Sequence, residues 1–148
     1  MSLNQRISED LKQAMKAKDS IRLSCLRMLR SSSKILQVEK RRELTDEEIQ
    51  SVLLSLVRRG KEAAKEFRNG NREDLALKEE IEIEIFYQYL PLQLTPEKIE
   101  ETVRQIISEL SAESPKDMGN VMKAAMDRMA GQVQGKEVSE IAKKFLTS

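Results

Sequence analysis

The sequence contains no histidine and no tryptophan, and its only cysteine is Cys25. Without histidine, the chain cannot supply a Ser-His-Asp triad, a Cys-His pair or an imidazole metal ligand. A lone cysteine cannot form an intramolecular disulfide, a CxxC redox pair or a thiolate zinc cage. Because these absences remove most common catalytic and metal-binding arrangements, we predict no catalytic residue, no bound metal and no cofactor.

Glycines, aromatic residues and long apolar runs are also scarce. The five glycines are scattered and aromatic residues make up 3% of the chain, so neither a dinucleotide loop nor extensive base stacking is expected. The longest uncharged stretch, residues 85–96, contains Pro91 and falls short of the roughly 20 apolar residues that span a bilayer. Residues 1–20 are rich in charge and lack the apolar core of a signal peptide. We therefore predict a cytoplasmic protein that does not associate with membranes.

Charged residues, by contrast, are abundant and unevenly distributed, although the net charge is only +1. Residues 12–42 contain ten basic and two acidic residues, whereas residues 79–113 contain nine acidic and two basic residues. The tail, residues 114–148, is mildly basic. Two interpretations are open: the basic and acidic segments pack side by side and neutralise each other, or the basic regions face a polyanion.

Apolar residues recur at helical spacing nearly throughout the chain, which predicts an all-α fold. Thr45 and Glu48 form a capping box before an apolar stripe, and Gly70 follows the expected end of that helix. Thr95 and Ser114 each precede a proline, the usual pattern of an N-cap followed by the first helical residue. A short last helix is expected after residue 135.

Residues 80–86 alternate between acidic and apolar positions, as in a half-buried strand. No second alternating run offers a partner strand, so we predict a helix over about residues 72–90. On one face it would bury Leu77, Ile81, Ile85 and Tyr89. Pro91 ends this helix and separates an N-terminal helical domain, residues 1–90, from a small C-terminal helical domain, residues 95–148.

A helix through the basic segment would carry two opposite faces. At about 100° per residue, Arg27, Arg30, Lys34 and Arg41 fall within roughly 60° of one another. This cationic face is either an ordinary solvated surface or a surface that follows phosphates. The residues nearly opposite form an expected core stripe, namely Ile21, Cys25, Met28, Leu29, Ser32 and Leu36.

Two short motifs resemble catalytic or nucleotide-binding signatures without satisfying them. Residues 31–34 have the S-x-x-K spacing but lack its companion motifs and a turn that would expose a nucleophile. Residues 131–137 place three residues between two glycines where a P-loop has four, and Glu137 replaces the required Ser or Thr. We interpret the first as a small-residue packing face. The second is either a plain turn or a helix N-terminus that receives a phosphate beside Lys136.

Several short segments, taken in order and spacing, resemble the YqeY family over nearly the whole chain. They are residues 14–19, 26–29, 43–48, 72–75, 78–80, 89–94 and 114–122, with Gly131 and Gly135-Lys136. The resemblance implies an all-helical protein whose C-terminal domain is similar to the tail of the GatB subunit of the glutamyl/aspartyl-tRNA amidotransferase. That tail helps to hold the tRNA and performs no chemistry.

The family is labelled with carbon–nitrogen ligase activity that uses glutamine as amido-N-donor, so an amide-transfer enzyme is one alternative. The present chain has neither an amidase signature nor an ATP-binding loop. The likeness concerns a tail that does no chemistry, so we expect no catalytic activity from this chain alone.

We therefore predict a non-catalytic accessory protein that binds tRNA or tRNA-like RNA through basic helical surfaces. The alternative is an interaction module that docks on an aminoacyl-tRNA synthetase or an amidotransferase subunit through a methionine-rich or acidic face. The candidate RNA-binding residues are basic side chains and two glycines of the tail, extended by four basic residues of the N-terminal half. They are Lys116, Lys123, Arg128, Gly131, Gly135, Lys136, Lys143, Lys144, Arg27, Arg30, Lys34 and Arg41.

Overall fold

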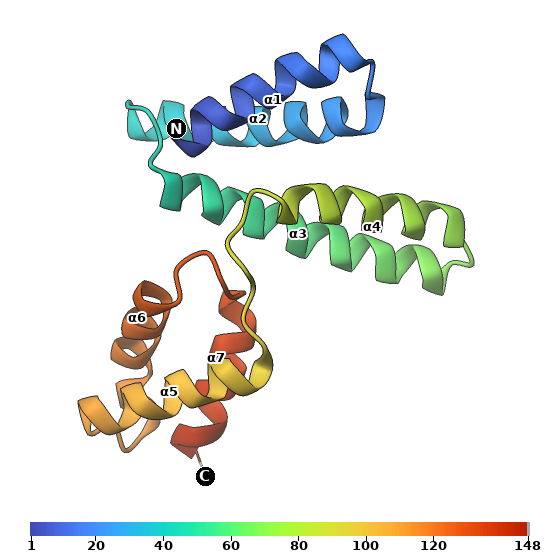
Figure 1. Cartoon of the computed structure of the whole chain (residues 1–148). Helices are drawn as coiled ribbons and strands as arrows, with labels where there is room; N and C mark the ends of the chain where they lie inside the picture. Colours follow the sequence, from blue (N-terminus) through green and yellow to red (C-terminus); the bar gives the residue numbers. More distant parts are fainter. Residues whose placement is uncertain (148) are drawn as a thin grey trace. The chain divides into compact units, whose positions relative to one another are not determined.

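The computed structural model describes residues 1–147, and every regular element in that range is helical (Figure 1). The helices are α1 (Leu3–Ala17), α2 (Ser20–Lys40), α3 (Asp46–Asn69), α4 (Glu73–Tyr87), α5 (Pro96–Leu110), the short 3-10 helix η1 (Pro115–Asp117), α6 (Met118–Arg128) and α7 (Gly135–Thr147). The chain divides into two compact units, Met1–Pro91 and Leu92–Ser148. The predicted all-α class is confirmed.

Local capping explains where the helices start. Thr45 Oγ1 accepts a hydrogen bond from the Glu48 N–H at 3.2 Å, and the Glu48 carboxylate accepts one from the Thr45 N–H at 2.9 Å. This is the predicted capping box at the start of α3. At the start of α5, Thr95 Oγ1 accepts a hydrogen bond from the Lys98 N–H at 3.3 Å, and Pro96 is the first helical residue. Both ends satisfy backbone donors that have no partner within the helix.

The N-terminal unit consists of two helical hairpins, α1–α2 and α3–α4, with α2 packed against both α3 and α4. Cys25, Leu26 and Leu29 of α2 meet Leu53 and Val57 of α3 in its core, and all five side chains are fully buried. Each of these leucine and valine side chains contributes about 1.5–3 kcal/mol by leaving water. This core places α2 so that its opposite side faces solvent.

The predicted helix over residues 72–90 exists as α4, but part of its predicted buried face is wrong. Leu77 and Ile81 are each 50% exposed. The buried residues of α4 include Ala76, Ile83 and Phe86, which lie on the side that meets α3 and α2. Because isoleucines alternate with glutamates along this helix, its apolar residues point in several directions. The packing partners, and not the periodicity, decide which of them are buried.

In the C-terminal unit, helices α5, α6 and α7 contact one another pairwise. Ile106 of α5, Val121 of α6 and Val138 of α7 are fully buried at their junction. The segment before α5 is bound to the loop before α7, because the Leu94 N–H donates to the Gln132 carbonyl at 2.9 Å. These contacts fix the start of α7, where several candidate residues lie.

Burial also gives the N-terminal core two groups that resist ionisation. Burial, reinforced by the charge of Glu82, raises the pKa of the Cys25 thiol from 9.0 to about 12. Burial, reinforced by a 2.6 Å hydrogen bond to Asp10, raises the pKa of Tyr89 from 10.0 to about 12. Both groups therefore stay neutral in the folded protein at pH values where the unfolded chain ionises them.

This shift predicts a loss of stability at alkaline pH. The contribution of both groups is fully present below pH 9 and is lost as the pH rises through 9 toward 12, because the unfolded chain then releases more protons. Urea unfolding at pH 8, 9.5 and 11 should show a falling free energy of unfolding. Native Cys25 should also react with Ellman's reagent about a thousandfold more slowly than in urea. Rapid labelling of the native thiol would contradict the burial of Cys25.

Candidate nucleic-acid interface

Helix α7 carries three lysines of the predicted interface, Lys136, Lys143 and Lys144, and all three are exposed. Val138 and Leu146 are buried on the other side and hold the lysine side toward solvent. Lys136 and Lys143 are seven residues apart, which places them on one face two turns apart. None of the three lysines forms an ion pair with another residue in the described part of the chain.

The other basic candidates of the tail differ in their surroundings. Lys116 lies in η1 and Lys123 in α6, and both are exposed. Arg128, at the end of α6, donates to the Glu109 carboxylate of α5 at 2.7 Å. This bond raises the pKa of Arg128 and lowers that of Glu109. Arg128 is therefore engaged within the protein, whereas the lysines are available to an external anion.

Of the two candidate glycines, Gly131 lies in the loop between α6 and α7, and Gly135 follows that loop directly. Gly131 is buried and has a φ of 76°, a conformation that side chains disfavour. Its carbonyl accepts a hydrogen bond from the Gln93 side chain at 2.8 Å. Gly135 is the first residue of α7. The structure thus places Gly131 in the interior, where it shapes the loop, and Gly135 at the helix start beside Lys136.

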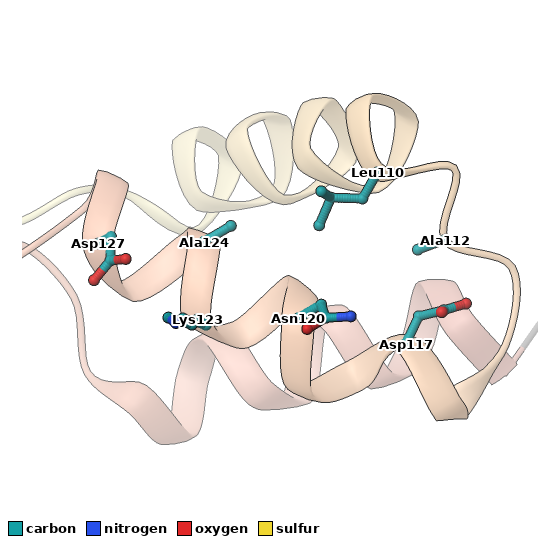
Figure 2. A pocket seen from close by; sticks show the side chains of 7 residues that line it. All are labelled: Leu110, Ala112, Asp117, Asn120, Lys123, Ala124 and Asp127. Atoms are coloured by element: carbon teal, nitrogen blue, oxygen red, sulfur yellow. The ribbon is translucent and has the colours of Figure 1, made fainter.

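Lys123 also lines a pocket of about 330 Å³ between the end of α5 and α6. Figure 2 shows Leu110 of α5 facing Asn120 of α6, with Lys123 and Asp127 farther along α6. Asp117 at the other end accepts backbone hydrogen bonds from residues 113 and 114, which lower its pKa. With two aspartates and one lysine, this pocket has no excess of positive charge for a phosphate.

In the N-terminal unit, Arg27, Arg30 and Lys34 are exposed on α2, as the periodicity predicts. Arg41 is not on that helix. It follows the end of α2 as its C-cap, with a φ of 57° that turns the chain away. The cationic face of α2 therefore contains three of the four predicted residues, because the helix ends one residue before Arg41.

The predicted core stripe of α2 also needs correction. Cys25 and Leu29 are fully buried, but Ile21 and Met28 are 45% and 42% exposed. Leu26, which was not expected in the stripe, is fully buried. Helix α2 packs against α1, α3 and α4 at once. The side of α2 that is buried therefore differs from the side on which its apolar stripe lies.

The structure shows how the two charged segments are placed, since α2, in the basic segment, packs against α4, which contains the first residues of the acidic segment. In residues 1–147, no ion pair joins the basic segment 12–42 to the acidic segment 79–113. The basic segment pairs locally, with Lys40 and Arg42 both bound to Glu48. Most cations of the basic segment are exposed, and their contact with a polyanion stays a prediction.

A second basic stripe, on α3, was missed by sequence reasoning. Arg58, Lys61, Lys65 and Arg68 are all exposed, and their spacing of three, four and three residues places them within about 80° of one another. Arg68 is bound to carboxylates of α4. The helical spacing of these four residues could have indicated the stripe. They lie outside residues 12–42, however, where basic residues dominate the local composition.

These features define an all-helical protein of two units, with exposed cations on separate helices. The chain belongs to the Yqey-like protein family, whose sequence model matches residues 4–146. Among its relatives is the altered inheritance of mitochondria protein 41 of Lachancea thermotolerans, 33% identical over 112 residues. That match covers 74% of this chain and 60% of the relative.

Two further proteins of the same description extend this comparison. The Kluyveromyces lactis protein is 33% identical over 74% of this chain and 60% of its own length. The Pyrenophora tritici-repentis protein is 27% identical over 89% of this chain and 74% of its own length. The chain thus spans about three-fifths of the first of these relatives. Their names place those proteins in mitochondria, whereas the cytoplasmic location of this chain stays a prediction.

None of the helices in the described part of the chain combines the length and the apolar character that crossing a bilayer requires. In residues 1–147, no group of three or more potential metal ligands gathers either.

Proposed function

We propose that this protein is a non-catalytic accessory protein that binds tRNA or tRNA-like RNA, with the C-terminal unit as the main contact. The observation that carries the proposal is that the tail lysines are exposed and not engaged in ion pairs within residues 1–147. Five exposed lysines in the C-terminal unit have no ion-pair partner within residues 1–147. They are Lys116, Lys123, Lys136, Lys143 and Lys144.

Such lysines suit the phosphate backbone of a folded RNA. An exposed ammonium neutralises a phosphate and releases its condensed counterions, which favours binding at low salt. Only 3% of the residues are aromatic, so stacking on unpaired bases contributes little. Recognition would then depend on the shape and backbone of the RNA, which is the usual way of binding A-form helices.

The test is a titration of fluorescently labelled tRNA with the whole protein at several salt concentrations. If all five lysines contact phosphates, the logarithm of affinity should fall with the logarithm of salt concentration with a slope of about −3.5 to −4.5. Arg128→Ala should leave this slope unchanged, because Arg128 is already bound to Glu109. Absence of tRNA binding at 50 mM salt would reject the proposal.

A second candidate function is docking on an aminoacyl-tRNA synthetase or an amidotransferase subunit. Its supporting observation is the exposure of Ile35 and Val38 on α2, at 67% and 68%. The methionine-rich stripe does not favour this function, because Met118, Met122 and Met126 pack against the core of the C-terminal unit. Binding to such a subunit that survives nuclease treatment, and is weakened by Ile35→Ser, would favour this alternative.

A further inference from the structure

A pocket of about 300 Å³ in the N-terminal unit lies where α1, α2 and α3 meet. Its polar lining consists of two cations, two hydroxyls and two amides, with no carboxylate among them. These residues are Asn4, Ser8, Arg30, Ser33, Lys34 and Gln37. Ser33 and Lys34 belong to the serine–lysine run that has no catalytic surroundings.

The charge of this pocket sets it apart from the rest of the molecule. Four other pockets in the described part of the chain each include at least one carboxylate. Arg30 and Lys34 come from the basic segment 12–42, and the fold gathers them with residues of α1 and α3 in a concave site that has no acidic residue. A site lined by one sign of charge concentrates ligands of the opposite sign.

The donors of the pocket suit a phosphoryl group. Arg30 donates to the Ser8 hydroxyl, and this bond holds its guanidinium at the edge of the pocket. A guanidinium and an ammonium together make the charge-assisted hydrogen bonds that phosphate oxygens accept. The hydroxyl of Ser33 and the amide of Gln37, also in the lining, can supply neutral donors.

The floor of the pocket is apolar. Ile7, Leu29 and Ile49 line it, and all three side chains are buried. A polar rim above an apolar floor fits a ligand that has an anionic end and an uncharged organic part. The volume, about 300 Å³, lies at the lower end of the range for small-molecule sites.

We infer that this pocket binds the terminal phosphate monoester of a nucleotide, either as a free nucleotide or at the 5′ end of an RNA strand. A terminal monoester has up to two negative charges and three free oxygens, which matches an arginine and a lysine better than an internal diester does. The site lies in the N-terminal unit. It is therefore independent of the tail lysines proposed to contact tRNA.

The test is a calorimetric titration of the whole protein with adenosine 5′-monophosphate (AMP) and with adenosine at low salt. AMP should saturate one site, and adenosine should bind at least about tenfold more weakly, since it lacks the phosphate. Arg30→Ala with Lys34→Ala should weaken AMP binding at least about tenfold. Arg27→Ala is the matched control, because Arg27 is exposed on the same helix and does not line the pocket.

A second arm separates the two sources of the phosphate. If short RNA with a 5′-phosphate binds more tightly than the same RNA with a 5′-hydroxyl, and the Arg30 and Lys34 variant loses this preference, the ligand is an RNA end. Equal binding of the two RNAs, together with AMP binding, assigns a free nucleotide.

Three results would overturn the inference. They are no saturation by millimolar AMP, equal binding of AMP and adenosine, or an equal loss of AMP binding in Arg27→Ala. Far-ultraviolet circular dichroism confirms that each variant is folded. Arg30→Lys, which keeps the charge and removes the planar fork, should retain part of the affinity. Failure of tRNA binding by the tail would leave these results unaffected.

Discussion

Replacing Gly60 by valine should lower the free energy of unfolding of the N-terminal unit by about 2 kcal/mol. Gly60 lies inside α3 where α4 crosses it closely. A Cβ atom at this position would be 2.9 Å from Cγ1 and 3.1 Å from Cδ1 of Ile83. Both distances are shorter than ordinary carbon contacts, so Ile83 or the whole of α4 must move to accommodate the new side chain.

Gly60→Val also improves the helix propensity of α3, but this gain is too small to make the substitution stabilising. Glycine inside a helix is less favourable than other residues by up to about 1 kcal/mol, and valine recovers only part of this. The expected overpacking outweighs that gain, because Ile83 is itself buried in the core and has little room to move. Urea unfolding followed by circular dichroism measures the difference.

Two comparisons isolate the contact between Gly60 and Ile83. Gly70→Ala, at the end of the same helix, should change stability by less than about 0.5 kcal/mol, because its Cβ would make only ordinary contacts at 3.5 Å or more. In a double-mutant cycle, Ile83→Ala should make Gly60→Val less harmful than it is alone. If Gly60→Val is as stable as the natural protein, α3 and α4 do not approach each other in this way.

The Gly60 contact illustrates which part of the fold could be predicted from the sequence. Capping residues such as Thr45 and Thr95 act on the backbone three residues away, so the sequence alone sets the helix starts. The buried side of α4 depends instead on Gly60, more than 20 residues earlier, which lets Ile83 approach. Periodicity within one helix carries no information about such a partner, so Leu77 and Ile81 were assigned to the wrong side.

The candidate sites likewise depend on tertiary contacts that the sequence pattern of a single helix does not predict. Exposure of Arg27, Arg30 and Lys34 follows from helical spacing, which is local. The bond between Arg128 and Glu109 joins residues 19 apart in different helices, and no pattern within α6 indicates it. The meeting of Ser8 with Arg30 likewise depends on how α1 folds back on α2. The sequence therefore predicts which cations reach solvent, and the tertiary fold decides which are engaged or gathered around a pocket.

Charge reversal on α7 by Lys136→Glu with Lys143→Glu should lower tRNA affinity about a hundredfold at 0.1 M salt. Each lost phosphate contact removes close to tenfold at this salt concentration, through counterions that are no longer released. The salt slope should also become shallower by nearly one unit for each lost contact. Titration of labelled tRNA with the double variant measures both quantities.

Helix stability does not explain such a loss, because the two substitutions act on the surface of α7. Lys136 lies in the first turn, where a glutamate interacts favourably with the helix dipole. The control is Lys78→Glu with Lys98→Glu, which changes the net charge equally at exposed lysines that flank acidic residues of α4 and α5. This control should lower affinity by less than about threefold. If both variants lose affinity equally, the protein senses only the total charge, and a defined interface on α7 is ruled out.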